Sequence, residues 1–248
     1  MENLNNNNAP DRLFAQQFES VKSFAFDQHV ADVFADMIKR SVPGYDSILR
    51  SIAMYCMQYA QKNTNIYDLG CSLGAVAVTA AEATKAQNCN IIAIDSSAAM
   101  VKKCQQIIQT KNLQDTITLQ QRDIVGLTIN NASVVVSNFT LQFIPKSLRL
   151  EVIQNIYAGL NSGGIFILSE KFKGDGKTDK FLIEHYHAYK KLNGYSNTEI
   201  QQKRQALQDV LVPDCIDEIT ARLHSVGFDN VVKWFQCFNF ASFIAVKK

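Results

Sequence analysis

The stretch Asn65-Ile66-Tyr67-Asp68-Leu69-Gly70-Cys71-Ser72-Leu73-Gly74-Ala75 decides the fold of this chain. Its apolar start predicts a buried strand that ends at Asp68-Leu69, and the glycines predict a tight turn into a helix that begins near Leu73. Gly70 and Gly74 permit the turn, because glycine adopts positive φ and lets the backbone approach a ligand closely. A helix that starts here offers free N–H groups and the positive end of its dipole to that ligand.

The segment Gly70-x-Ser72-x-Gly74 also matches the nucleophile elbow of α/β-hydrolases. That kind of site needs an acid and then a histidine downstream, in that order. The histidines after the turn are His185, His187 and His224. None of them follows an evident strand-end loop with an acid partner, so the pattern does not favour a hydrolase.

A loose match to the dinucleotide-binding fingerprint, Gly70-x-Ser72-x-x-Ala75, is a second alternative. In that fingerprint the first strand usually ends in an apolar residue, whereas here Asp68 puts a carboxylate at the strand end. A carboxylate can meet the cationic amino-acid end of a ligand. The pattern D-x-G-x-(G/S)-x-G is therefore typical of enzymes that bind S-adenosylmethionine (SAM). A strand–helix turn that binds nothing is the remaining alternative.

Polar residues also follow three further predicted strands, which span residues 90–95, 116–120 and 132–139. Asp95 lies about 20 residues past the glycine turn, where an acid hydrogen-bonds a ribose diol. Asp123-Ile124 follows the next strand and could cap an adenine. The acid would accept from the adenine amine, and the aliphatic side chain would pack on the ring. A surface turn with no ligand is the alternative. Asn138 ends the last of these strands, again at the edge where open α/β sheets bind ligands.

Composition narrows the class of protein. The chain has 248 residues, of which 47% are hydrophobic, so one large domain can bury a sizeable core. A formal charge of +2 gives no support for a nucleic-acid surface. We expect no membrane span, because no run of about 18 apolar residues exists. Residues 1–10 lack an apolar signal region and are polar, so we expect a disordered N-terminus and a cytoplasmic protein.

Metal and disulfide sites are not expected either. The six cysteines are scattered without a C-x-x-C pair, which favours free thiols. The four histidines form no ligand spacing.

Strands alternate with helices along the middle of the chain, which predicts a doubly wound, mostly parallel sheet.

Apolar periodicity predicts a helix over 11–40, with a break near Phe24, that covers the sheet or a neighbouring subunit. Ser41-Val42-Pro43-Gly44-Tyr45 is a turn, and Tyr45 either contacts the core or leans over a ligand. Gly163-Gly164 ends the last helix before a fifth strand. Further helices are predicted at 46–61, 74–86, 97–111 and 146–160, and the fifth strand at 165–171.

Residues 173–212 are an insertion after the fifth strand, placed to form a lid or a dimer surface. It contains two predicted helices, Asp179–Leu192 and Asn197–Val210, and Ser196 with Glu199 has capping-box spacing for the second. Lys203-Arg204 in that helix is either functional or a solvated charged face. After a helix at 216–227, strands at 229–236 and 239–246 are too close for a helical crossover, so they form an antiparallel hairpin. This gives a seven-stranded sheet of the class I SAM-methyltransferase type in a single domain over 11–248.

Across nearly its whole length the chain resembles the carboxy-S-adenosylmethionine synthase (CmoA) family. The asparagine-rich N-terminus and a short Lys173–Lys180 segment depart from the family pattern. The stretches that carry the resemblance are Ser41–Tyr45, Tyr67–Ser72, Ile91–Asp95, Asn138–Phe143, Leu168–Phe172, Asn193–Ser196, Gln202–Arg204 and Trp234–Phe240.

The resemblance implies that SAM and prephenate give carboxy-SAM, phenylpyruvate and water. The SAM methyl group, acidified by the sulfonium, would lose a proton and capture the carboxyl that prephenate loses as carbon dioxide. The product would supply a partner enzyme that carboxymethylates a wobble uridine in tRNA, so this protein itself needs no contact with nucleic acid. A homodimer is also implied.

The resemblance puts SAM contacts on residues that mostly coincide with the strand ends. Arg204 is implied to meet the new carboxylate, either in its own subunit or from the neighbouring subunit of a dimer, because a guanidinium binds a carboxylate in bidentate fashion. No side chain stands out as the general base, which leaves the substrate's own hydroxyl as the candidate proton acceptor. A conventional methyltransferase and a non-catalytic SAM-binding protein are the alternatives. The predicted site residues are Tyr45, Asp68, Gly70, Cys71, Ser72, Asp95, Ser96, Asp123, Ile124, Asn138 and Arg204.

Overall fold

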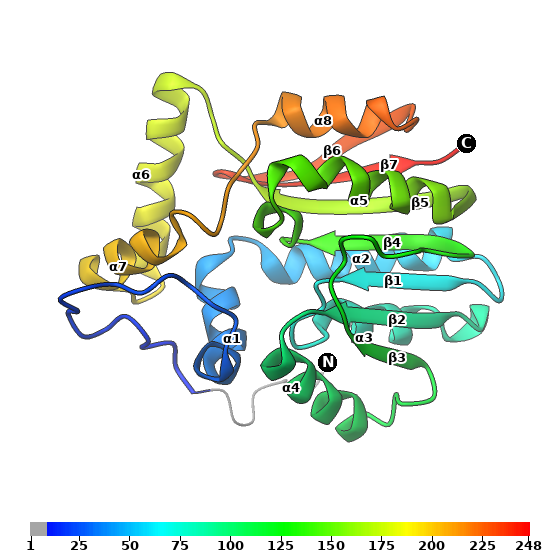
Figure 1. Ribbon diagram of the computed structural model, residues 1–248, viewed down its shortest axis with the longest axis horizontal. Coiled ribbons are helices and arrows are strands. Elements are labelled where there is room, and N and C mark those ends of the chain that lie inside the picture. The colour runs from blue at the N-terminus through cyan, green and yellow to red at the C-terminus, as the bar shows by residue number, and fades with distance from the viewer. Residues whose placement is uncertain (1–8) are drawn as a thin grey trace.

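The computed structural model describes residues 9–248, and its centre is a sheet of seven strands within that range (Figure 1). The strand order is β3-β2-β1-β4-β5-β7-β6, with only the pairs that involve β7 antiparallel. This confirms the predicted sheet and its terminal hairpin. The strands are β1 (Asn65–Leu69), β2 (Asn90–Asp95), β3 (Ile117–Gln121), β4 (Ala132–Asn138), β5 (Leu160–Lys171), β6 (Asn230–Cys237) and β7 (Phe240–Val246).

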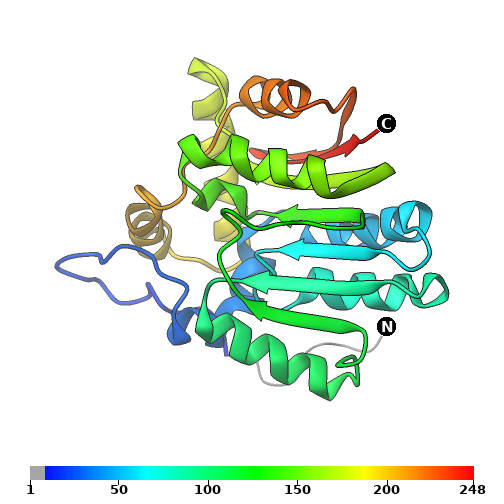
Figure 2. The same cartoon turned by 45° about the vertical axis from the view of Figure 1, so that its right-hand side comes forward.

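Helices cover both faces of the sheet, as expected when strands are apolar on both sides. One core cluster joins the sheet to α2, α3 and α4, and a second joins it to α5 and α8. Figures 1 and 2 show α1, α6 and α7 beyond the carboxyl ends of the parallel strands. The helices are α1 (Gln28–Ser41), α2 (Tyr45–Tyr59), α3 (Ala75–Ala83), α4 (Ala98–Thr110), α5 (Lys146–Gly159), α6 (Gly176–Leu192), α7 (Asn197–Leu207) and α8 (Ile216–Ser225), with short 3-10 turns at Lys85–Gln87 and Leu141–Phe143.

Side-chain caps set where several helices begin. The predicted capping box is confirmed at α7, where Ser196 Oγ accepts from the Glu199 N–H and the Glu199 carboxylate accepts from the Ser196 N–H. Ser97 caps α4 by accepting from the Met100 N–H. These bonds satisfy backbone donors that a helix terminus otherwise leaves free.

The helix predicted over 11–40 is wrong in its first half, because the described chain is helical only from Gln28. In the segment before it, main-chain groups bond to α7 instead of to their own turn. The Gln202 side chain accepts from the Phe18 N–H at 2.8 Å and donates to the carbonyl of Gln16 at 2.7 Å. Phe24 N–H donates to the Ala206 carbonyl at 2.9 Å. Long-range partners therefore replace helical hydrogen bonds here. The predicted disorder covers residues 1–10, of which 1–8 lie outside the described residues, while residues 9 and 10 are exposed and belong to no helix or strand.

The fifth strand is longer than predicted. β5 begins at Leu160, so Gly163-Gly164 lies inside the strand and not before it. The register between β4 and β5 shifts near Ala132, and Gly163 has a φ of 74°. An irregularity of this kind lets a glycine pair interrupt the strand without ending it.

Candidate active site

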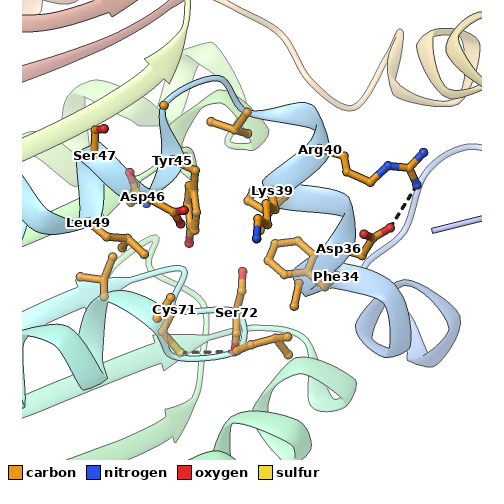
Figure 3. Close-up of a pocket in the computed structure, with 18 of the residues that line it drawn as sticks. Phe34, Asp36, Lys39, Arg40, Tyr45, Asp46, Ser47, Leu49, Cys71 and Ser72 are labelled. Atoms are coloured by element: carbon orange, nitrogen blue, oxygen red, sulfur yellow. Dashed lines mark hydrogen bonds and ion pairs between the residues drawn. The ribbon is translucent and has the colours of Figure 1, made fainter. Parts of the chain in front are cut away.

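A cavity of about 1200 Å³ opens at the carboxyl ends of β1 and β4 (Figure 3). The strand order reverses between these two strands, and open α/β sheets bind ligands at such a point. Six of the predicted site residues line the cavity: Tyr45, Asp68, Gly70, Cys71, Ser72 and Asn138.

The glycine turn forms the floor of the cavity. Gly70 has a φ of 78°, and a Cβ at this position would lie 2.3 Å from the Thr140 side chain, so no other residue fits. The N–H groups of Gly70 and Cys71 both donate to the Ile94 carbonyl, at 2.8 and 2.9 Å. The turn is thereby held against β2, and the following Ser72 is kept at a φ of 49°, which is uncommon for a residue with a side chain.

Asp95 fixes this turn from the end of β2. One of its carboxylate oxygens accepts from the Ser72 N–H and the other from the Ser97 N–H, both at 2.8 Å. Burial raises the pKa of Asp95, and these two bonds oppose that rise. Each carboxylate oxygen has a further lone pair, so Asp95 can still accept from ribose hydroxyls. Asp95 lies behind the turn and is not among the residues that line the cavity.

Asp68 is the buried acid of the cavity. It is 1% exposed, and its Oδ2 accepts from the Ala77 N–H in the first turn of α3 at 3.0 Å. Burial raises the pKa of Asp68 to about 7; the Ala77 bond lowers it and the nearby Asp95 raises it further. A cationic group in the cavity would stabilise the ionised carboxylate.

Asn138 supplies an unpaired acceptor. Its Oδ1 is buried and has no hydrogen-bond partner within residues 9–248. The next residue, Phe139, is held at a φ of 63° by the bond from its N–H to the Ser169 carbonyl at 2.7 Å. Strain of this kind persists where the surroundings impose it, often at functional sites. A buried unpaired oxygen is costly unless a ligand donates to it, which fits a SAM amino or hydroxyl group.

The opposite wall comes from α1 and from the start of α2. Figure 3 shows the side chains of Phe34, Lys39 and Tyr45 facing Ser72 across the space. Burial, Asp68 and Asp46 all raise the pKa of Tyr45, so its hydroxyl stays protonated and can donate.

Sequence reasoning did not find part of the cavity wall. The missed residues come from α1 and from the end of α6: Phe34, Lys39, Arg40, Tyr189 and Asn193. The amphipathic pattern of α1 shows which residues are buried but not that others face a ligand. Arg40 stacks on Tyr195 at 3.9 Å and donates to the Asn193 carbonyl at 2.8 Å, which joins α1 to the α6–α7 loop.

The remaining predicted residues do not line the cavity. Ser96 is exposed after β2. Asp123 is exposed and accepts from the Val125 N–H, while the Ile124 side chain is 6% exposed and packs in the second core cluster. Arg204 is exposed on α7. Contacts of these residues with SAM therefore stay predictions.

No metal cluster and no membrane-spanning helix is found among residues 9–248. In this range no group of three histidine, cysteine, aspartate or glutamate side chains is placed to hold a metal ion. No helix in the same range is long and apolar enough to cross a membrane.

Comparison with known proteins identifies close relatives. A family model described as a methyltransferase domain matches residues 66–164. A carboxy-S-adenosyl-L-methionine synthase of Pseudoalteromonas translucida is 47% identical over 96% of this chain and 98% of its own length. One of Vibrio parahaemolyticus is 44% identical over 98% of this chain and 100% of its own length.

Solved structures share the fold at low identity. A putative SAM-dependent methyltransferase from Methanococcus maripaludis has a TM-score of 0.62 at 20% identity, covering 93% of this chain and 98% of that one. Human N-acetylserotonin methyltransferase in complex with SAM has a TM-score of 0.59 at 14% identity, covering 89% of this chain and 55% of that one. These likenesses show the class I SAM-methyltransferase fold.

Proposed function

The chain belongs to the carboxy-S-adenosyl-L-methionine synthase family, and on that premise we propose that it converts SAM and prephenate to carboxy-SAM, phenylpyruvate and water. SAM is a substrate here and not a resident cofactor. Asp68 faces its cationic amino-acid end, Asp95 accepts from the ribose, and Asn138 uses its unpaired oxygen on a SAM donor.

The observation that carries the proposal is the position of Arg204 relative to the cavity. Arg204 is close enough to Lys171, at the end of β5, to lower the pKa of that lysine. Lys171 lies two residues past Ser169, and Ser169 pairs with Asn138 of the cavity. This position near the end of β5 supports a role for the guanidinium beside the proposed SAM site, because a conventional methyltransferase has no use for a cation facing a sulfonium.

The chain supplies binding and orientation in this reaction. Arg204 binds the carboxylate as it joins the former methyl carbon, and its fork of donors fixes the plane of that carboxylate. The cavity residues hold SAM in one orientation, which converts a bimolecular step into a positioned one. The hydroxyl that prephenate loses takes the methyl proton and leaves as water, so no side chain is assigned as the base.

The product chemistry extends the proposal. We propose that carboxy-SAM supplies a partner enzyme that modifies a wobble uridine of tRNA, and that this protein acts as a cytoplasmic homodimer, as the family resemblance implies. The net charge of +2 agrees with a link to RNA that is metabolic and not a direct contact.

The test is incubation of the purified protein with SAM and prephenate, followed by mass spectrometry. The proposal expects a product with the mass of SAM plus one carbon dioxide, together with phenylpyruvate. Demethylated SAM with a methylated acceptor would instead show a conventional methyltransferase. SAM that binds but is not converted would show a non-catalytic SAM-binding protein.

A further inference from the structure

Four basic side chains gather beyond the end of β5, and we call them the cationic cluster: Lys171 of β5, His187 and Lys190 of α6, and Arg204 of α7. The Nζ of Lys171 lies 4.8 Å from the centre of the Tyr186 ring, and the Nζ of Lys190 lies 5.7 Å from the same ring. Two ammonium groups therefore share one aromatic side chain. Lys190 is 4% exposed, so this part of the cluster is shielded from water.

Neither Lys171 nor Lys190 has an ion-pair partner in the described part of the chain, unlike the neighbouring Lys203. Lys203 is about as buried as Lys190, at 5% and 4% exposed, but pairs with Asp11 at 3.3 Å. A buried amine without an anion is costly, because burial removes its hydration and the aromatic contacts replace only part of it.

The carboxylates near the cluster accept hydrogen bonds from other groups and form no ion pair with Lys171 or Lys190. Asp179 accepts from the Gly174 N–H at 2.9 Å, and Glu199 accepts from the Ser196 N–H at 2.7 Å. Asp11 accepts from both Tyr195 and Lys203. The charge of the cluster is therefore left for a ligand to balance.

The pKa values of the cluster show the electrostatic cost of placing these cations close together. Burial and then Arg204 lower the pKa of Lys171 to about 8, against a weaker opposite effect of Asp179. Burial, Lys203 and Lys171 lower the pKa of Lys190 to about 7, opposed by Asp11 and Glu199. Burial and the surrounding cations also lower the pKa of His187. A bound anion would reverse these shifts.

The cluster adjoins the SAM cavity. Side chains two residues apart on a strand share a face, so Lys171 lies on the face of Ser169 and of its partner Asn138, roughly 7 Å further along β5. Tyr189 and Asn193, on either side of Lys190 in sequence, line the cavity. Tyr186 also packs on Phe240 with 5.0 Å between ring centres, and both rings belong to the buried core, so the aromatic support of the two lysines is fixed in place.

We propose that Lys171 and Lys190 bind the carboxylate that the second substrate, a 2-oxo acid with a carbocyclic ring, keeps through the reaction. This rests on the proposed function, in which prephenate carries two carboxylates. The ring carboxylate leaves and is received by Arg204. The carboxylate beside the oxo group stays on phenylpyruvate, so it needs cations of its own.

The test uses Lys171→Met and Lys190→Met, with Lys191→Met as the matched control on the exposed side of α6. Methionine removes a buried charge at similar length, so folding should survive, and thermal unfolding checks this. We expect the KM for prephenate and the inhibition constant of phenylpyruvate to rise at least roughly tenfold in both variants. The Kd for SAM should change less than about threefold, and the control should behave like the wild type.

The number of protons taken up when the ligand binds distinguishes direct binding by the two lysines from a structural role. When phenylpyruvate binds near pH 8, its carboxylate should raise the pKa of the two lysines, so the wild type takes up protons. Calorimetry in buffers of different ionisation enthalpy measures this uptake, and either methionine variant should reduce it. Unchanged affinity for phenylpyruvate in both variants, or an equal loss of SAM affinity, would overturn the proposal.

The two proposals fail in different ways. If the wild type converts prephenate and the methionine variants keep its KM, the lysine site is wrong and the proposed function stands. If the wild type does not convert prephenate but binds phenylpyruvate through these lysines, the 2-oxo acid site stands and prephenate is not the substrate.

Discussion

Asp95 accepts a hydrogen bond from the Ser72 N–H at 2.8 Å, across 23 residues of sequence. The same carboxylate accepts from Ser97 at the start of α4. One side chain therefore joins the turn after β1 to the helix after β2, and it does so next to the position where a ribose would bind. The shape of the glycine turn in the cavity floor therefore depends on this acid.

Asp95→Ala should weaken SAM binding by roughly 10- to 100-fold, because it removes acceptors from two main-chain donors and from the ribose. Isothermal titration calorimetry with SAM measures this. The exposed Asp115, changed to alanine, is the control for loss of a negative charge. Equal affinities in the two variants would show that Asp95 plays no part in the site.

Gly70→Ala should abolish SAM binding and destabilise the fold by roughly 1–3 kcal/mol. The new Cβ would meet Thr140 at 2.3 Å, and φ at 78° strains any residue with a side chain. Gly126→Ala is the matched control, because φ is 69° there but no atom lies within 4 Å of the added Cβ. The control should show the backbone cost alone in thermal unfolding. A Gly70 variant that binds SAM normally would contradict the geometry of the turn.

SAM affinity should rise with pH between about 5.5 and 7.5, by up to roughly tenfold. Asp68 has a pKa of about 7, so it is largely protonated at the lower pH and attracts the SAM ammonium only once ionised. The upper limit stays below roughly 7.7, the pH at which about half of the α-amino groups have lost their proton. Titrations at several pH values measure the change.

Asp68→Asn is the control for this pH dependence, and its SAM affinity should vary little over the same range. The pH dependence of the free energy of unfolding gives a second check, because Asp68 fixes the sign of its slope. The native state holds the Asp68 proton between roughly pH 4 and 7 while the unfolded state has lost it, so the free energy of unfolding falls as pH rises through that window. The asparagine variant should lose this part of the slope. The same slope in both proteins would rule out Asp68 as its source.

Arg204→Ala should remove binding of carboxy-SAM while SAM binding stays within a few-fold of the wild type. In the proposed function the guanidinium binds only the added carboxylate, and Arg204 does not line the cavity. Competition of the two ligands for each protein gives the ratio of affinities. The pattern that would refute the assignment is an equal loss of both ligands.

Much of the fold followed from local patterns. β2 contains the apolar run Ile91–Ile94 and β4 the run Val134–Val136, and runs of this kind that end in a polar residue such as Asp95 or Asn138 are typical of parallel strands buried on both faces. The short spacing of the last two strands left a hairpin as the only connection. The helix predicted before Gln28 was wrong because main-chain groups of that segment bond to Gln202, as much as 188 residues away. No local pattern encodes a partner at that distance.

The candidate site was predicted only where a motif marked it. Asp68, the glycine turn and Asn138 end strands of the sheet, so topology brought them together. Lys39 and Tyr189 lie on helices whose periodicity shows a buried face but not the cavity beside it. Lys171 and Lys190 share a ring through the packing of α6 on β5, and their separate places in the sequence gave no sign of this.

Transfer of the carboxyl group is the central claim, and an isotopically labelled ring carboxylate of prephenate tests it most directly. After incubation with SAM and the purified protein, mass spectrometry should find the label in carboxy-SAM, in an amount equal to the phenylpyruvate formed. Label released as carbon dioxide while SAM stays unchanged would contradict the account.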